Sequence, residues 1–251
     1  MKFKVVIPAR YASVRLPGKP LLDIAGKPMI QHVWERAVES GAAEVVVATD
    51  DSRIADACQG FQADVCMTRE NHRSGSDRIA EVAAIRGWGG EEIIVNLQGD
   101  EPCMPAMLLS QVAEDMERHP AASVTTLCAP ITDRQTLFDP HTVKVVTDSE
   151  GYALYFSRAP IPWHRDEFVE AERPLPTNTG FARHIGLYAY RSGYLANFVE
   201  WKHAPIELAE SLEQLRVLWH GGKIHVSQAK ENPGHGVDTR EDLSRIIAEL
   251  G

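Results

Sequence analysis

The chain has 251 residues, of which 44% are hydrophobic and 24% are charged, and its formal net charge is -9 at neutral pH. These proportions are typical of a soluble globular protein and exclude a disordered chain, a collagen-like repeat or a coiled coil as the main architecture. The acidic balance argues against duplex nucleic acid or an anionic membrane as the partner, because both attract basic surfaces.

The first half of the chain alternates between predicted strands and helices. Continuous apolar runs predict buried parallel strands at 3–7, 45–48, 65–67 and 93–97. Apolar residues at helical spacing predict a helix from Pro28 that Gly41 closes, followed by helices at 53–58, 76–86 and 107–116. Residues 9–27 are rich in Gly, Pro and basic side chains and are expected to form a loop. The alternation predicts a doubly wound (Rossmann-like) α/β fold with helices on both faces of a mostly parallel mixed sheet.

The second half changes character. Strands are expected at 123–127, 143–146, 152–156, 185–190 and 223–226, and helices at about 192–201, 207–219 and 240–250. The stretch 160–176 is rich in Pro, Asp and Glu and is expected to form a surface excursion. One compact domain with an inserted antiparallel part fits this order better than two independent domains.

Simple counts bear on compartment and metal content. The four cysteines form no C-x-x-C pair, which is typical of reduced thiols in the cytoplasm (Cys58, Cys66, Cys103 and Cys128). The ten histidines form no H-E-x-x-H motif, so a structural zinc is not expected. The N-terminal apolar run is too short for a signal peptide, and no apolar segment is long enough to span a membrane.

The loop after the first strand concentrates positive charge. Arg10, Arg15 and Lys19 lie between residues 8 and 20 with no acidic residue among them. Ligands of open α/β sheets bind at the carboxyl ends of the strands, so this loop predicts an anion site, most simply for a polyphosphate. Neither G-x-x-x-x-G-K-[ST] nor G-x-G-x-x-G is present, which disfavours a P-loop or a dinucleotide cofactor. On charge alone, an ordinary solvated loop is an equal alternative.

Two carboxylates are candidates for a Mg²⁺ site. Asp100 follows the strand at 93–97 directly and has Gln98 and Glu101 beside it. A carboxylate at a strand end that faces a polyphosphate loop suits Mg²⁺, which prefers one or two carboxylates together with substrate phosphates. Asp238 is the natural second ligand, although Asp and Thr at 238–239 could also simply cap the last helix.

The loop sequence ARYASVRLPGKPL at 9–21 resembles the signature loop of the sugar nucleotidyltransferases. Further blocks in the same order are similar to the 3-deoxy-manno-octulosonate (Kdo) cytidylyltransferase family. They are VVATDD at 46–51, CMTRENHRSGSDR at 66–78, VNLQGDEP at 95–102, VKVV at 143–146, GYALYFSRAPIPW at 151–163, RHIGLYAYR at 183–191, LEQLR at 212–216 and GVDT at 236–239. A colinear set of this kind is far more specific than any single motif.

The resemblance implies an enzyme that converts CTP and Kdo to CMP-Kdo and pyrophosphate for lipopolysaccharide biosynthesis. It implies Mg²⁺ as cofactor, a cytoplasmic homodimer, and an antiparallel subdomain that carries the dimer surface. Residues from about 1 to 130 would form the nucleotide-binding half of a single domain, and residues from about 131 to 251 the sugar-binding and dimerisation half.

The resemblance also implies roles for individual residues. Lys19, Asp100 and Asp238 would be catalytic, and the two aspartates would bind the metal. The expected nucleotide-binding residues are Pro8, Ala9, Arg10, Ser13, Arg15, Lys19, Ser74, Gly75, Arg78 and Gln98. The expected sugar-binding residues are Arg78, Gln98, Arg158, His184, Glu213 and Gln214. Some of these residues have an ordinary alternative. Ser74 or Ser76 could be only a helix cap, Arg158 an ion pair at the sheet edge, His184 a hydrogen-bonded strand histidine, and Glu213 and Gln214 a solvated helix face.

Three other functions stay open. The first is a cytidylyltransferase for a different acidic sugar, such as a sialic acid or the 8-amino version of Kdo. The second is a glycosyltransferase, although its D-x-D motif is missing and only Gly99-Asp100-Glu101 stands near that place. The third is a nucleotide-binding regulator without activity, against which the retention of both Asp100 and Asp238 argues.

Overall fold

The computed structural model describes residues 2–12, 16–169, 174–176 and 178–250. These residues form two compact units. The first unit comprises Met1–Glu114, Leu187–Glu200 and Lys230–Gly251, and the second comprises Asp115–Gly186 and Trp201–Ala229. Neither unit is a continuous half of the chain, because the chain returns to the first unit twice.

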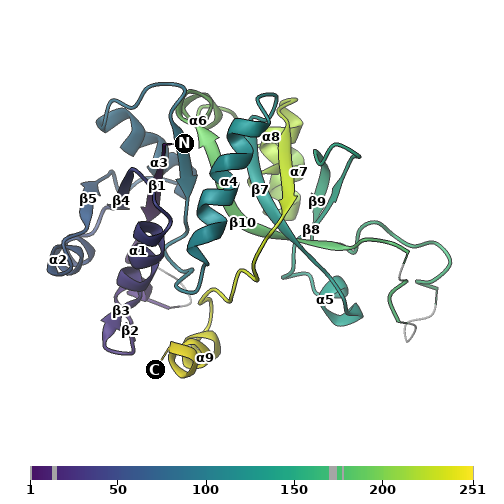
Figure 1. The fold of residues 1–251 in the computed structure, drawn as a ribbon, viewed down its shortest axis with the longest axis horizontal. Coiled ribbons are helices and arrows are strands. Elements are labelled where there is room, and N and C mark those ends of the chain that lie inside the picture. Colours follow the sequence, from purple (N-terminus) through teal and green to yellow (C-terminus); the bar gives the residue numbers. More distant parts are fainter. Residues whose placement is uncertain (1, 13–15, 170–173, 177, 251) are drawn as a thin grey trace. The chain divides into compact units, whose positions relative to one another are not determined.

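The strands of the first unit lie in the order β10-β6-β1-β4-β5 (Figure 1). Their bounds are Phe3–Pro8 for β1, Glu44–Thr49 for β4, Asp64–Met67 for β5, Ile93–Asn96 for β6 and Ala182–Arg191 for β10. The pairs β1–β4, β1–β6 and β4–β5 are parallel, and β10 runs antiparallel to β6 through Tyr188–Arg191. Val5, Val6 and Ile7 are fully buried, as expected for a parallel strand covered on both faces.

Helices connect these strands as the sequence predicts. They are α1 (Met29–Glu39), α2 (Ser52–Gly60) and α3 (Gly75–Ile85). The side chain of Asp51 caps α2 by accepting the N–H of Arg53, and Gly41 lies beyond α1 with a φ of 76°. Right-handed crossovers place α1 and α2 on one face of the sheet and α3 on the other, because the chain reverses its direction across the sheet after β5.

The segment 9–27, expected to be a loop throughout, contains short regular elements, so that prediction is wrong in part. A 3-10 turn spans Lys19–Leu21, and a two-stranded hairpin pairs β2 (Asp23–Ile24) with β3 (Lys27–Pro28). Ala25 and Gly26 turn the hairpin with φ values of 51° and 84°. Two residues with positive φ are the signature of a tight hairpin turn, but alanine is an uncommon residue there and hid the signal.

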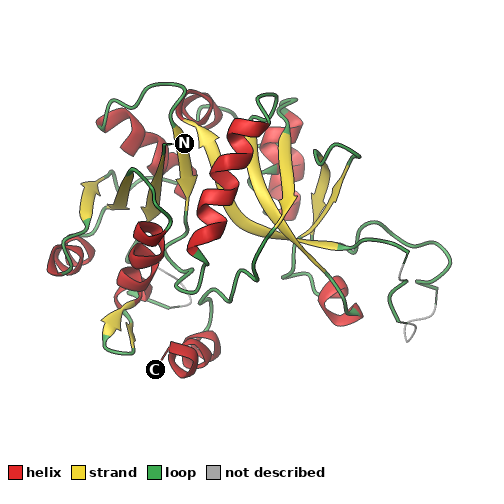
Figure 2. Cartoon of the chain, in the orientation of Figure 1, coloured by secondary structure: helices red, strands yellow, loops and turns green. Residues whose placement is uncertain are grey.

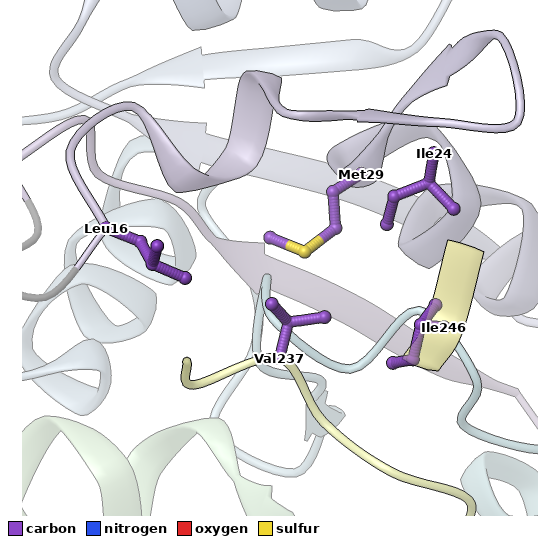
Figure 3. Close-up of a cluster of buried hydrophobic side chains, with 5 residues drawn as sticks. All are labelled: Leu16, Ile24, Met29, Val237 and Ile246. Carbon is purple, nitrogen blue, oxygen red and sulfur yellow. The ribbon is translucent and has the colours of Figure 1, made fainter. Parts of the chain in front are cut away.

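Buried apolar side chains tie the start of the first unit to its end. Figure 3 shows Leu16, Ile24, Met29, Val237 and Ile246 in one cluster. Ile246 belongs to the last helix, α9 (Arg240–Leu250), and Val237 precedes that helix. This cluster therefore fixes the basic N-terminal loop and the segment next to Asp238 on the same small core.

The second unit contains strands β7 (Val124–Pro130), β8 (Lys144–Thr147), β9 (Ala153–Ser157) and β11 (Ile224–Gln228). The strand order is β11-β7-β10, with β11 parallel to β7, while β8 pairs antiparallel with both β9 and β10. Figure 2 shows strands accompanied by helices along the chain. The fold class is therefore α/β with a mostly parallel mixed sheet, as the sequence predicts.

Five further helices have the bounds Ala106–Arg118 (α4), Arg134–Phe138 (α5), Ser192–Phe198 (α6), Pro205–Glu210 (α7) and Leu215–Trp219 (α8). The sequence did not predict α5, and the single helix expected at 207–219 is wrong. The chain turns between α7 and α8, where Ser211 has a φ of 51°. Among the residues that the structure describes, no helix is both long enough and apolar enough to cross a bilayer.

Candidate active site

A pocket of about 410 Å³ lies in the first unit, beyond the carboxyl ends of β1 and β6. This is the edge at which open α/β sheets bind ligands. It is lined by Pro8, Ala9, Arg10, Ala12, Lys19, Pro20, Gln98, Gly99, Asp100 and Asp238. The structure thus brings together most of the residues expected to bind the nucleotide phosphates and the metal.

A single ammonium group joins the two candidate metal ligands. Lys19 Nζ lies 2.6 Å from Asp100 Oδ2 and 3.3 Å from Asp238 Oδ1. Lys19 is only 9% exposed, whereas the side chains of Asp100 and Asp238 are 38% and 57% exposed, so a buried ammonium meets two carboxylates that reach the solvent. Three groups that are far apart in the sequence therefore converge on one point.

Backbone contacts set the position of Asp238. The N–H of Val237 donates to the carbonyl oxygen of Asp100 at 2.9 Å, and the Val237 side chain is buried in the cluster of Figure 3. A Cβ atom on Gly236 would lie 2.9 Å from Glu101 Oε1 and 3.3 Å from the Asp100 carbonyl oxygen, so the two segments run close together at this glycine. A helix cap alone does not account for Asp238, whose carboxylate reaches Lys19 instead.

The donor set of this point fits a magnesium ion. Two carboxylate oxygens already converge on one cationic group, and carboxylate oxygen is the protein ligand that Mg²⁺ prefers. Two protein ligands leave most of the octahedral positions for water and substrate phosphates. The side chains present are therefore compatible with the expected metal.

A second, smaller pocket of about 50 Å³ adjoins the same strand ends. It is lined by Pro8, Ala9, Arg10, His72, Ser74, Gly75, Arg78 and Gln98. Gly75 lies against Pro8, where an added Cβ atom would meet Pro8 Cγ at 3.4 Å. Arg10 lines both pockets, so it is placed between the two groups of candidate residues.

Ser74 and Arg78 also have structural roles. The Ser74 side chain accepts the N–H of Asp77, and Asp77 accepts the N–H of Ser74, which completes a capping box at the start of α3. The buried guanidinium of Arg78 lies 3.2 Å from Asp50 Oδ2 and donates to Thr68 Oγ1. The helix cap expected as the alternative for Ser74 is thus present, on a residue that also lines the pocket.

Sequence reasoning missed His72 and Asp50. The His72 side chain lines the small pocket, and its Nε2 lies 2.5 Å from Glu81 Oε2. Burial alone would raise the pKa of Glu81, but hydrogen bonds from His72 and from the Arg69 backbone outweigh it and lower that pKa. The only signal in the sequence for His72 was its position two residues before Ser74, in the same block of residues.

Arg158 follows β9 in the second unit and is held by backbone groups. Its Nε donates to the carbonyl oxygen of Glu210 at 2.7 Å and its Nη1 to that of Pro140 at 2.9 Å. The fully buried Lys144 donates to the carbonyl oxygen of Arg158 at 2.6 Å. Burial lowers the pKa of Lys144. The guanidinium of Arg158 is therefore anchored by carbonyl oxygens rather than by an edge ion pair.

His184 lies in β10 with its ring edge-on to Phe156 and its Nε2 3.0 Å from Thr126 Oγ1. Burial lowers the pKa of His184 to about 3, so the ring is neutral at physiological pH. A neutral imidazole can donate or accept a hydrogen bond to a sugar hydroxyl but cannot neutralise a sugar carboxylate.

Glu213 and Gln214 lie in the turn between α7 and α8. Gln214 is only 7% exposed, which contradicts the solvated helix face considered as its alternative. Arg216 holds this turn: it donates to Glu207 through Nε at 2.9 Å and through Nη2 at 2.5 Å, and its Nη2 lies 3.8 Å from Glu213 Oε2.

The candidate residues divide between the units. Arg158, His184, Glu213 and Gln214 belong to the second unit, and the described candidates for nucleotide and metal binding belong to the first. Ser13 and Arg15 lie outside the described residues.

Comparison with known proteins identifies the family. A family model described as "Cytidylyltransferase" matches residues 4–224. The chain is 58% identical over 244 residues to the 3-deoxy-manno-octulosonate cytidylyltransferase of Pseudomonas fluorescens, which covers 97% of this chain and 96% of the relative. It is 57% identical over 248 residues to the protein of the same name from Hahella chejuensis, covering 99% of this chain and 97% of the relative.

Solved structures agree with these relatives. The structure of a CMP:2-keto-3-deoxy-manno-octonic acid synthetase complexed with CTP is 45% identical, with a TM-score of 0.90, and covers 100% of this chain and 98% of its own. A cytidylyltransferase from Leptospira borgpetersenii, 17% identical with a TM-score of 0.63 over 99% of this chain and 86% of its own, shares the fold. Family model, full-length relatives and structural match thus agree: this chain belongs to the cytidylyltransferase family, in the branch of the 3-deoxy-manno-octulosonate cytidylyltransferases.

Proposed function

We propose that this chain transfers CMP from CTP to Kdo, releasing pyrophosphate, in the supply of activated Kdo for lipopolysaccharide biosynthesis. The observation that carries the proposal is the near-full-length identity of 58% to a relative named for this activity. The pocket with Lys19, Asp100 and Asp238 supports it, because a nucleotidyl transfer needs phosphate-binding and metal-binding groups at one place.

In this proposal, CTP occupies the two pockets of the first unit. The cytidine would bind in the small pocket beside Ser74 and Gly75, where backbone groups of Pro8 and Ala9 can read the polar edge of the base. Arg10 lines both pockets and would lie beside the nucleoside and its phosphate. Lys19, together with Arg15, would bind the outer phosphates and stabilise the leaving pyrophosphate.

Asp100 and Asp238 would hold Mg²⁺. When bound, the ion supplies positive charge to the phosphate oxygens and lowers the pKa of a hydroxyl that coordinates it. The two aspartates hold the position from which this charge acts, and the Lys19 ammonium offsets part of their negative charge.

The protein's contribution to the reaction is positioning. The anomeric oxygen of Kdo forms a bond to the α-phosphorus of CTP, while the bond from that phosphorus to the oxygen of pyrophosphate breaks and the hydroxyl proton passes to solvent water. The protein need form no covalent bond with either substrate. The rate enhancement therefore comes from orienting the two substrates and from neutralising the charge of the phosphates. Lys19 and Arg10 orient the triphosphate, and Gln98, which lines both pockets, would contact both substrates.

Kdo recognition needs a cation for the carboxylate and both hydrogen-bond donors and acceptors for the hydroxyls. Arg158 is the candidate cation of the second unit, with Arg78 as the candidate of the first. His184 is neutral at physiological pH and suits a hydroxyl, as do Glu213 and Gln214. We also propose that the enzyme acts as a cytoplasmic homodimer whose surface includes the segment 160–180.

An enzyme-linked pyrophosphate assay tests the proposed reaction. Purified chain with CTP, Mg²⁺ and Kdo should release one pyrophosphate for each CMP-Kdo formed, with UTP and ATP as nucleotide controls. Replacing Kdo by 8-amino-Kdo or a sialic acid separates the acidic sugars from one another. Turnover with a rival sugar but not with Kdo would reassign the substrate, and CTP binding without turnover of any acidic sugar would indicate a regulator.

A further inference from the structure

Three side chains that commonly bind metals meet in the second unit, and none of them belongs to the candidate active site. Asp115, His119 and His225 can each bring one ligand atom to within 4.8 Å of the other two. Asp115 lies in the last turn of α4, His119 follows one turn later, and His225 lies in β11. More than a hundred residues separate the strand histidine from the helix pair, so no spacing motif in the sequence could reveal the cluster.

Asp115 is a buried acid without a strong cationic partner. It is 5% exposed, and its carboxylate accepts a hydrogen bond from the Ser227 hydroxyl. Within the described part of the chain, no lysine or arginine forms an ion pair with it. A buried carboxylate is costly unless a cation pairs with it or a metal binds it.

His225 offers a nitrogen with an unmet hydrogen-bonding capacity. The residue is 6% exposed, and its Nδ1 is buried with no hydrogen-bond partner among the described residues. Burial lowers the pKa of His225, and the neighbouring His119 lowers it further, so the ring is neutral and retains a lone pair. A buried polar atom without a partner costs stability, and a metal ion is one group that would satisfy it.

The orientation of His119 is fixed by the helix end. Its Nδ1 lies 3.0 Å from the carbonyl oxygen of Asp115, and because a carbonyl only accepts, this nitrogen carries the proton. The lone pair is therefore on Nε2, an arrangement typical of histidines that bind metals. The two rings stack with centroids 3.5 Å apart and an angle of 15°, so ligation of one ion by both requires the more exposed His119 ring to tilt.

We propose that Asp115, His119 and His225 bind one divalent transition-metal ion of the Zn²⁺ type. Two imidazole nitrogens and one carboxylate oxygen suit Zn²⁺ and disfavour Mg²⁺, which binds oxygen ligands. The ion would neutralise Asp115, satisfy His225 and join the end of α4 to β11, while three protein ligands leave a fourth position for water. No zinc was expected from the sequence because it lacks zinc-binding motifs. Such motifs detect only ligands at fixed spacing along the chain, whereas this cluster is assembled by the fold.

Zinc titration of the metal-free full-length chain tests this site. Isothermal titration calorimetry with Zn²⁺, in excess Mg²⁺ to occupy the active-site carboxylates, should show one Zn²⁺ bound per chain. Removing a residue that hydrogen-bonds to a metal ligand typically weakens metal binding by roughly 10- to 100-fold. His119→Gln or His225→Gln removes a ligand itself and should weaken Zn²⁺ binding by more than that. Ser227→Ala, which removes such a group from Asp115, should fall within that range, and His220→Gln, an exposed histidine of the same unit, should have no effect.

Two further measurements make the outcome decisive. Asp100→Asn should still bind one Zn²⁺ at this site. Wild type loaded with Co²⁺ in place of Zn²⁺ should show the visible absorption bands of a four-coordinate ion, and His119→Gln should lose them. The partly exposed His119 gives a variant that can be judged even if His225→Gln does not fold. The proposal is overturned if wild type binds no Zn²⁺ under excess Mg²⁺, if binding survives both histidine substitutions, or if Asp100→Asn abolishes it. None of these results depends on the identity of the sugar substrate.

Discussion

At the scale of single residues, Lys19 and its two aspartates link the fold to the proposed chemistry. Lys19 Nζ lies 2.6 Å from Asp100 Oδ2 and 3.3 Å from Asp238 Oδ1. The same lysine is proposed to bind the outer phosphates of CTP, so binding of nucleotide and metal would exchange one set of charge partners for another. The next two predictions test the two sides of that exchange.

Asp100→Asn should lower turnover at saturating CTP by about 10³-fold or more, which corresponds to roughly 4 kcal/mol of transition-state stabilisation. The amide keeps the size of the side chain but removes the charge that would hold Mg²⁺. Steady-state kinetics measure the loss, and circular dichroism checks that the fold is retained. Turnover within threefold of wild type would remove Asp100 from the metal site.

Lys19→Ala should weaken binding of CTP more than binding of CMP, because CMP lacks the outer phosphates. Calorimetric titration of the variant with both nucleotides measures the difference. Lys27→Ala, at a half-buried ion pair with Glu35, is a suitable control and should change neither affinity. If the affinities for CTP and CMP fell equally, Lys19 would not bind the outer phosphates, and its role would be limited to its contacts with Asp100 and Asp238.

At the scale of elements, the start of α3 combines a helix cap with a pocket wall. The structure has Ser74 as the cap. Sequence reasoning left the cap open between Ser74 and Ser76, because a serine before a helical apolar pattern is a strong start signal. It could not decide between a cap and a nucleotide contact, since both need an exposed hydroxyl at the same place. The structure contains the cap and also places Ser74 in the lining of the small pocket.

Substitutions at Ser74 can separate these two roles. Ser74→Ala should lower the free energy of unfolding by about 1 kcal/mol through loss of the cap. Ser74→Asp should restore the cap yet raise the KM for CTP, because it adds a negative charge beside the bound nucleotide. Chemical denaturation and steady-state kinetics measure the two effects. An unchanged KM in the aspartate variant would leave Ser74 with the cap alone.

The turn between α7 and α8 shows where sequence reasoning failed at this scale. A helical apolar pattern continues through 207–219, and neither glycine nor proline interrupts it. The break depends on a buried ion pair between Glu207 and Arg216, nine residues apart, which the linear pattern cannot reveal. Burial alone would raise the pKa of Glu207, but hydrogen bonds from Arg216 and His203 outweigh it and lower that pKa.

Glu207→Gln should lower the free energy of unfolding by about 3–5 kcal/mol, because it removes the nearer of the two carboxylates that face the buried Arg216 charge. The pKa of Glu207 is lower in the folded chain than its ordinary value of 4.5, so the unfolded chain binds the proton first as the pH falls. The stability supplied by this pair is therefore complete above pH 4.5 and is lost progressively below it. Denaturation measured at several pH values below 4.5 should show that the free energy of unfolding falls more steeply with decreasing pH in wild type than in the variant. The same pH dependence in both proteins would contradict this assignment.

At the scale of the whole molecule, the sequence predicts the α/β class and nearly every strand, because buried parallel strands carry continuous apolar runs. The sequence does not predict how the chain divides into the two units, because residues 187–200 and 230–251 belong to the first unit although they follow the start of the second. That return brings Asp238 to Lys19, which also contacts Asp100. Family motifs identified both aspartates, whereas Asp115, His119 and His225 stand in no motif and needed the structure to be seen together.

The proposed homodimer also belongs to this scale. In the second unit, the Trp163 ring lies edge-on to Phe138 and Phe168 and is 59% exposed, and the nearby Val169 is 78% exposed. If the segment 160–180 forms the dimer surface, Trp163→Lys should shift the chain towards monomer in sedimentation velocity, while Trp219→Lys, at another exposed tryptophan, should not. A wild-type monomer at micromolar concentration would refute the homodimer.

Gly99 and Gly236 carry a consequence for how this protein tolerates sequence change. An added Cβ atom would lie 2.9 Å from the Pro8 carbonyl oxygen at Gly99 and 2.9 Å from Glu101 Oε1 at Gly236. Under selection for activity, a saturation library should lose nearly all substitutions at Gly99, where the close atom is backbone, and fewer at Gly236, where the Glu101 side chain can move aside. Homology-based redesign of the sugar specificity should therefore keep Gly99 constant and draw its diversity from the second unit.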